Sequence, residues 1–130
     1  MDKTEQFIKM ADCPEIQERW KKEQYGDILA CYDKKRTYGN GSHYYTLLLA
    51  GGPPIRKSKN RTWLPRQDDI QKMVGFKYAG PGYVRKLWDF VLNESETRAY
   101  NSFEQLWLAF YMYEKHGKVW SSKEERWGEK

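Results

Sequence analysis

A short basic stretch around one tryptophan holds the residue types with the most specific chemical potential in this chain. Between residues 56 and 66 five cations surround Trp63: Arg56, Lys57, Lys59, Arg61 and Arg66. Arginine offers a planar fork of donors that matches phosphate oxygens in pairs, and an aromatic ring offers a face on which a base can stack. We therefore interpret this stretch as a candidate site for a phosphorylated ligand.

The hairpin expected before this stretch adds three candidate ligand-binding residues, His43, Tyr44 and Tyr45. Successive residues of a strand point to opposite faces, so at most one of the two tyrosines joins any given surface. Two interpretations of Trp63 stay open, a stacking ring or a core residue, because tryptophan is heavily buried on average.

Charge is distributed unevenly along the chain. The net charge is +5, and residues 34–67 contain eight Lys and Arg but no Asp or Glu. Such asymmetry is typical of proteins with a phosphate or nucleic-acid partner, although two unrelated surface loops would produce it too.

No complete catalytic or metal-binding pattern is present in the sequence. The two histidines, His43 and His116, are far apart, and neither HExxH nor GxxxxGK[ST] occurs. Asp68 and Asp69 fit the first turn of a helix better than a metal site. Cys31 has no base beside it that would make it a nucleophile. We expect a protein that is not an enzyme and needs no metal or cofactor.

Length and composition indicate a single domain over residues 1–130. The sequence has no apolar run long enough for a membrane span and no signal peptide, so we expect a cytoplasmic location and no membrane partner. In that compartment Cys13 and Cys31 are expected to be buried free thiols, although a disulfide between them stays open.

The first half of the chain reads as a short helix followed by a β-hairpin. Asp12 is the predicted cap of the helix, with Pro14 in its first turn. Strands are predicted over 26–36 and 43–50, joined by a type I′ turn at Asn40-Gly41. A flexible loop over about 51–62 should follow.

The second half reads as three helices, over 66–75, over 82–93 and after Ser102, where Gln105 completes a capping box and Gly117 ends the helix. A strand at 118–120 and a frayed tail over about 121–130 should follow. Three tryptophans are assigned to the core or to packing between helices: Trp88, Trp107 and Trp120. The predicted class is α+β, a small antiparallel sheet (hairpin about 26–50) with three to four helices packed on it.

Three blocks, "FIKMADCPEIQERW" (7–20), "WLPRQDDIQKMV" (63–74) and "FEQLWLAFYMYEKHGKVW" (103–120), resemble a family of small phage and prophage proteins of Firmicutes. The resemblance implies a phage accessory protein and implies no particular chemistry. The basic middle of the chain departs from the family pattern, so the shared blocks are expected to be scaffold.

The leading hypothesis is a non-enzymatic, anti-defence phage protein that sequesters a phosphorylated ligand, above all a nucleotide signal. Sequestration needs cations, rings and enclosure, and enclosure in a small chain favours a homo-oligomer. One alternative is a nucleic-acid-binding protein, whose affinity would fall steeply with salt. Another is an inhibitor that binds an acidic surface of a host protein.

Overall fold

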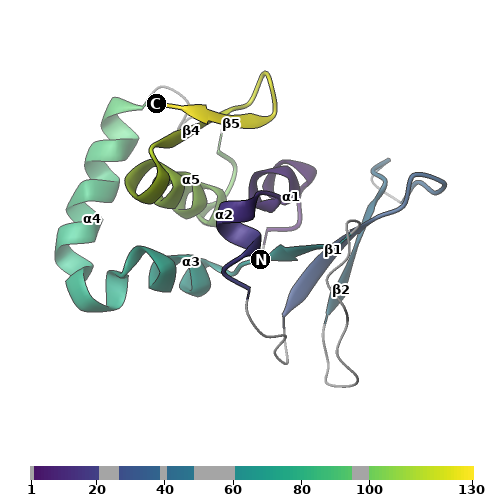
Figure 1. Ribbon diagram of the computed structural model, residues 1–130, viewed down its shortest axis with the longest axis horizontal. Helices are drawn as coiled ribbons and strands as arrows, with labels where there is room; N and C mark the ends of the chain where they lie inside the picture. The colour runs from purple at the N-terminus through teal and green to yellow at the C-terminus, as the bar shows by residue number, and fades with distance from the viewer. Residues whose placement is uncertain (1, 21–26, 39–40, 49–60, 95–99) are drawn as a thin grey trace. The chain divides into compact units, whose positions relative to one another are not determined.

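The structure, a computed structural model, describes residues 2–20, 27–38, 41–48, 61–94 and 100–130. These residues form five helices and five strands (Figure 1). In chain order they are α1 (Glu5–Ala11), α2 (Pro14–Gln17), β1 (Ile28–Tyr32), β2 (Tyr44–Leu48), β3 (Arg61–Leu64), α3 (Gln67–Val74), α4 (Phe76–Asn93), α5 (Phe103–His116), β4 (Lys118–Ser121) and β5 (Arg126–Glu129). The strands form a three-stranded and a two-stranded antiparallel sheet, so the predicted α+β class is confirmed.

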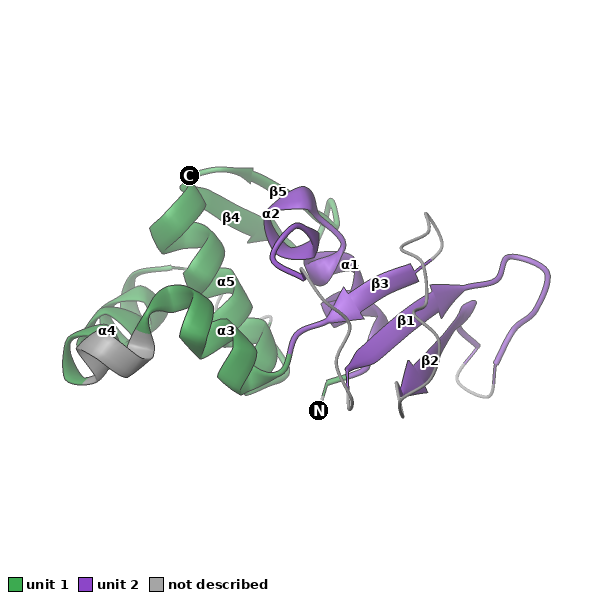
Figure 2. Cartoon of the chain, turned by 60° about the horizontal axis from the view of Figure 1, so that its bottom comes forward, with its two compact units in different colours: residues 1–2, 66–130 green, residues 3–65 purple. Residues whose placement is uncertain are grey.

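The chain divides into two compact units, where the sequence predicts one domain. Unit 2 comprises residues 3–65, and unit 1 comprises residues 1–2 and 66–130 (Figure 2). Each unit has its own buried apolar side chains, among them Phe7 and Leu29 in unit 2, and Leu108 and Trp120 in unit 1. The two units are described separately below.

Two short helices open unit 2, and the sequence predicts only the second. α1 begins after Thr4, whose Oγ1 accepts a hydrogen bond from the Phe7 N–H at 3.3 Å. α1 ends directly before Asp12, and Cys13 is the residue that precedes Pro14 at the start of α2. The predicted Asp12 cap is wrong by one residue, because Asp12 already terminates the preceding helix.

β1 and β2 pair antiparallel over their full lengths, which confirms the predicted hairpin. Among the described residues, β1 ends at Tyr32, before the predicted end at 36, and β2 begins at Tyr44, one residue after the predicted start at 43. Residues 26, 49 and 50 of the predicted ranges lie outside the described residues. The backbone turns after Asp33, whose Oδ1 accepts a hydrogen bond from the Lys35 N–H at 3.0 Å, and such local bonds compete with strand pairing. The predicted type I′ turn involves Asn40, which lies outside the described residues.

Residues 61–64 form β3, where the sequence predicts the end of a loop over about 51–62. The rest of that predicted loop, up to residue 60, lies outside the described residues. β3 pairs antiparallel with β1, so β1 is the central strand, as Figure 2 shows. A side chain closes the outer edge of β3: Gln17 Oε1 accepts a hydrogen bond from the Trp63 N–H at 2.9 Å, and Gln17 Nε2 donates to the Trp63 carbonyl at 3.0 Å. The amide takes the place of a neighbouring strand.

Unit 1 begins with two consecutive helices. α3 confirms the helix predicted over 66–75, and the Arg66 N–H at its start donates to the Asp69 carboxylate at 2.9 Å. α4 starts at Phe76, not at residue 82 as predicted, and contains Pro81. A proline removes one intrahelical hydrogen bond, and the other turns of this 18-residue helix hold its backbone.

The N-terminal cap of α5 confirms the predicted capping box. Ser102 Oγ accepts a hydrogen bond from the Gln105 N–H at 3.2 Å, and Gln105 Oε1 accepts one from the Asn101 N–H at 3.1 Å. The buried Asp2 carboxylate accepts from the Ser102 hydroxyl and, at 2.8 Å, from Gln105 Nε2. Gly117 ends the helix in a left-handed conformation, as predicted.

The C-terminal segment is ordered into a hairpin. β4 confirms the strand predicted at 118–120, and residues 126–129 form β5 against it, so the prediction of a frayed tail is wrong there. Trp120 and Trp127 face each other across the two strands, with ring centroids 5.2 Å apart in an edge-to-face arrangement. Cross-strand aromatic pairs of this kind stabilise short ladders.

Two of the three tryptophans assigned to the core are buried, Trp107 and Trp120, but Trp88 is 62% exposed. α4 turns Phe90 toward α5, where its ring lies 5.7 Å from that of Phe110. Side chains two residues apart on a helix point about 200° apart, so Trp88 points to the side opposite Phe90.

Candidate functional site

The predicted ligand-binding residues are distributed over both units. Arg56, Lys57 and Lys59 lie outside the described residues. Arg61 and Trp63 are on β3, Tyr44 and Tyr45 are on β2, and His43 directly precedes β2. Arg66 belongs to unit 1, where it is an exposed residue at the start of α3.

The strand registers bring two of these residues into one row. Cys31 of β1 lies opposite Tyr45 of β2 and also opposite Arg61 of β3. Directly opposed residues in antiparallel strands project from the same face, so the three side chains share one face of the sheet. The Tyr38 ring packs on Tyr45 with centroids 5.2 Å apart. We call Tyr38, Tyr45, Cys31 and Arg61 the sheet row.

The electrostatics of the row follow from this arrangement. Burial raises the pKa of the Cys31 thiol, and its contacts with Tyr45 and Arg61 act in the opposite direction. The charge that Cys31 would carry, and the hydrogen bond between the two groups, raise the pKa of Tyr45. At neutral pH the side chains of Cys31 and Tyr45 are therefore both uncharged, and the thiol is not activated as a nucleophile.

Trp63 is a core residue and not an open stacking ring. It is 6% exposed, and its ring stacks on that of Trp20 with centroids 6.4 Å apart and planes 9° apart. Its indole Nε1 is buried and finds no hydrogen-bond partner among the described residues, a property that Trp120 of unit 1 shares. Residues 61 and 63 are two apart on β3, so Arg61 and Trp63 project from the same face.

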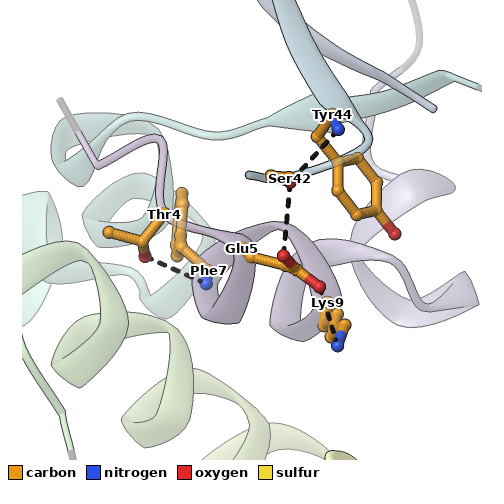
Figure 3. A network of polar contacts seen from close by, with 6 residues as sticks. All are labelled: Thr4, Glu5, Phe7, Lys9, Ser42 and Tyr44. Atoms are coloured by element: carbon orange, nitrogen blue, oxygen red, sulfur yellow. Dashed lines mark hydrogen bonds and ion pairs between the residues drawn. The ribbon is translucent and has the colours of Figure 1, made fainter. Parts of the chain in front are cut away.

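Tyr44 belongs to a different polar network on the other face of the sheet (Figure 3). The Ser42 hydroxyl donates to Glu5 Oε2 at 3.2 Å and accepts from the Tyr44 N–H at 3.1 Å, and Lys9 forms an ion pair with Glu5 at 3.0 Å. Burial, then the carboxylates of Asp12 and Glu5, raise the pKa of Tyr44. Of the two tyrosines, Tyr45 lies with a cation and Tyr44 lies near carboxylates.

His43 is held at the end of the hairpin. Its Nδ1 lies 2.8 Å from the Arg36 carbonyl oxygen, and Nδ1 is the donor because a carbonyl oxygen only accepts. Its ring lies edge-on to the Tyr32 ring, with ring centroids 5.8 Å apart.

Three cations that we did not select from the sequence, Lys34, Lys35 and Arg36, are all exposed in the connection after β1. The signal that could have identified them is the acid-free segment 34–67, of which they are the first members. Cys31 was also not selected as a ligand-binding residue, because its proximity to Arg61 and Tyr45 depends on the strand registers.

Unit 1 contains a cavity of about 310 Å³ between the end of α4 and the start of α5. It is lined by Val91, Tyr100, Asn101, Ser102, Phe103 and Leu106. Among the described residues no group of three or more His, Cys, Asp or Glu is placed to hold a metal ion. Cys13 and Cys31 are buried thiols, as predicted.

None of the helices in the described ranges combines the length and the apolar character that crossing a lipid bilayer requires. Comparison of the chain with family models, curated proteins and solved structures gives no match.

Proposed function

We propose that this chain is a non-enzymatic phage accessory protein that binds and sequesters a phosphorylated ligand, a nucleotide signal, on the sheet row of unit 2. The observation that carries the proposal is the double register of β1, which aligns Arg61 with Tyr45 across Cys31. The row offers a guanidinium for the phosphate and the Tyr38–Tyr45 pair for the base.

The chemistry of the row fits a nucleotide better than it fits a substrate to be transformed. Arg61 is half-buried, so a phosphate there meets a charge that water screens less than it screens an exposed lysine. A tyrosine ring can stack on any base, a contact worth about 1–3 kcal/mol. Because burial keeps Cys31 neutral, the row has no activated nucleophile, as sequestration requires.

A further feature supports an anionic ligand. The exposed cations Lys34, Lys35 and Arg36 attract anions toward unit 2, which contains twelve Lys and Arg against seven Asp and Glu.

The phage context rests on the three sequence blocks. These blocks fall on α1 and α2, on β3 with α3, and on α5 with β4. The basic middle of the chain, which departs from the family pattern, includes β2 and the turn before it. This distribution supports a common scaffold that carries a variable binding segment.

Thermal denaturation of the full chain with a panel of cyclic dinucleotides, ATP and inorganic phosphate tests the proposal. We expect at least one nucleotide to raise Tm, and Arg61→Gln to weaken its binding about 10- to 100-fold. Arg126→Gln is the matched control, since Arg126 likewise begins a strand but lies in unit 1. If no nucleotide stabilises the protein, or if both variants bind equally, the proposal is wrong.

Nucleic-acid binding is the second candidate, and it rests on the three consecutive exposed cations after β1. A basic tip of this kind would follow a phosphate backbone. The triple variant Lys34→Gln, Lys35→Gln, Arg36→Gln would then abolish gel shifts at low salt, while Arg61→Gln would change them little. Binding to a host protein stays a prediction from charge alone.

A further inference from the structure

The outer face of α4 carries an uncovered apolar row. Val84, Trp88 and Leu92 are 51%, 62% and 64% exposed. They are spaced four residues apart, so they form one continuous line along the helix. We call these three residues the α4 stripe.

The stripe is distinct from the face that α4 uses within unit 1. The Phe90 ring packs on Phe110 at 5.7 Å and on Tyr113 at 5.1 Å, and Lys86 forms an ion pair with Glu114 at 3.8 Å, all on α5. A helix of a folded unit normally buries one apolar sector of about 100° and is polar elsewhere. α4 has a second apolar line, rotated by about 160° from Phe90, for which packing on α5 gives no reason.

We propose that the α4 stripe is the contact between two copies of this chain, which pair through antiparallel α4 helices about a two-fold axis near Trp88. In a two-fold interface each residue must meet its symmetry equivalent or a complementary residue. Val84 and Leu92 are equidistant from Trp88, so antiparallel pairing places Trp88 against Trp88 of the second copy and Val84 against Leu92 of the second copy.

The charges beside the stripe favour a second copy over an unrelated partner. Arg85 and Asp89 are exposed on one edge of the stripe. Their midpoint is position 87, within one residue of Trp88, so the same two-fold axis brings Arg85 of each copy next to Asp89 of the other. The edge is thus complementary to itself, with an aromatic anchor at its centre.

This inference goes beyond ligand binding and does not depend on it. The stripe is in unit 1 and the sheet row is in unit 2. A substitution in the stripe should therefore affect dimerisation, and a substitution in the row should affect ligand binding.

Sedimentation velocity of the full chain, from about 1 µM to about 1 mM, tests the pairing, since small interfaces dissociate in this range. We expect concentration-dependent dimers, and a dimer at least about 30-fold weaker in Trp88→Glu. Leu48→Glu is the control, because Leu48 is an equally exposed apolar residue, at 64%, and lies in unit 2. A monomer at every concentration, or a dimer that Trp88→Glu leaves intact, overturns the proposal.

Charge reversal tests the antiparallel geometry without changing the apolar residues. Arg85→Glu alone and Asp89→Arg alone place like charges opposite each other in the pair, and each should weaken the dimer about two- to tenfold. The double variant restores unlike charges and should recover most of the wild-type affinity. If the loss of dimerisation free energy in the double variant equals the sum of the losses in the two single variants, the antiparallel pairing is wrong.

Discussion

The two units differ in charge and in what their surfaces offer. Unit 2 contains twelve Lys and Arg against seven Asp and Glu, whereas unit 1 contains eleven of each. Unit 2 presents exposed cations and tyrosines near its hairpin, and unit 1 presents the apolar α4 stripe. The two proposals assign recognition of an anion to unit 2 and association through apolar contact to unit 1, and substitutions can address each part alone.

The largest expected contrast is between one tryptophan from each unit. Trp63→Ala should lower the free energy of unfolding by about 3–5 kcal/mol, because it removes a buried ring that stacks on Trp20. Trp88→Ala should change it by less than about 0.5 kcal/mol, because Trp88 is mostly exposed. Urea unfolding at low protein concentration, where α4 pairing is absent, measures both. Equal losses would contradict the assignment of Trp63 to the core and Trp88 to the surface.

A smaller loss is expected from the side chain that closes the sheet edge. Gln17→Ala should destabilise the protein by about 1–3 kcal/mol, since the Trp63 N–H and carbonyl both lose their partner. Gln71→Ala, a half-buried glutamine of α3 in unit 1, is the matched control and should stay within about 0.5 kcal/mol. Hydrogen exchange at the Trp63 amide, measured in parallel, should accelerate only in Gln17→Ala. An unchanged rate would show that the amide does not depend on Gln17.

Alkaline pH should reveal a further difference, because unit 2 contains Cys31, Tyr44 and Tyr45, whose pKa values are all raised. A raised pKa stabilises the folded state fully below the unfolded-state values, 9.0 for the thiol and 10.0 for the phenols, and the contribution is lost as pH rises through the folded-state values. We therefore expect the free energy of unfolding to decrease above roughly pH 9.

Cys31→Ala removes the thiol from this balance and should make the decrease above roughly pH 9 shallower than in the wild type. Urea titrations at a series of pH values measure the slope. The same slope in both proteins would mean that Cys31 titrates with its ordinary pKa.

The smallest expected effect is the difference between two ion pairs, each formed by residues four apart on a helix. Lys9–Glu5 in α1 spans 3.0 Å, and the more exposed Lys72–Asp68 in α3 spans 3.8 Å. Both lysines lie in the last turn of their helices, so the helix dipole contributes similarly to each. Lys9→Gln should cost about 0.5 kcal/mol and Lys72→Gln less.

Measuring the cost of Lys9→Gln at acid pH checks whether this cost comes from the ion pair with Glu5. The hydrogen bond with Lys9 is the main cause that lowers the pKa of Glu5 below 4.5. A lowered pKa stabilises the folded state above the unfolded-state value, and the contribution is lost as pH falls through the folded-state value. The cost of Lys9→Gln should therefore decrease as pH falls below 4.5. A cost that does not change with acid pH would have another origin, such as packing of the lysine stem.

Local signals account for the elements that could be predicted from the sequence. α5 is bounded by Ser102 and Gly117, whose capping roles follow from residue type alone. β3 has no such signal: it is four residues long, and its edge is completed by Gln17, which lies far away in the chain. Helical spacing identifies Trp88 as part of an apolar set, but only the position of α5 decides which side of that set is buried.

The residue types of the candidate site could be predicted from the sequence, but which of these residues lie side by side could not. Residue types indicated cations beside an aromatic ring, and the structure aligns Arg61 with Tyr45 instead of leaving Trp63 open. That alignment is fixed by two strand registers, and a shift of one residue in either would move a member of the row to the other face. No composition or spacing encodes such a register directly.

The central claim is that the sheet row binds a phosphorylated ligand, and an NMR titration tests it most directly. The ¹⁵N-labelled full chain would be titrated with the panel nucleotide that stabilises it most, with inorganic phosphate as reference. We predict saturable shifts of the amides of Cys31, Tyr45 and Arg61, with those of β4 and β5 unchanged. Shifts confined to unit 1, or no saturable shift in the row, would contradict the claim.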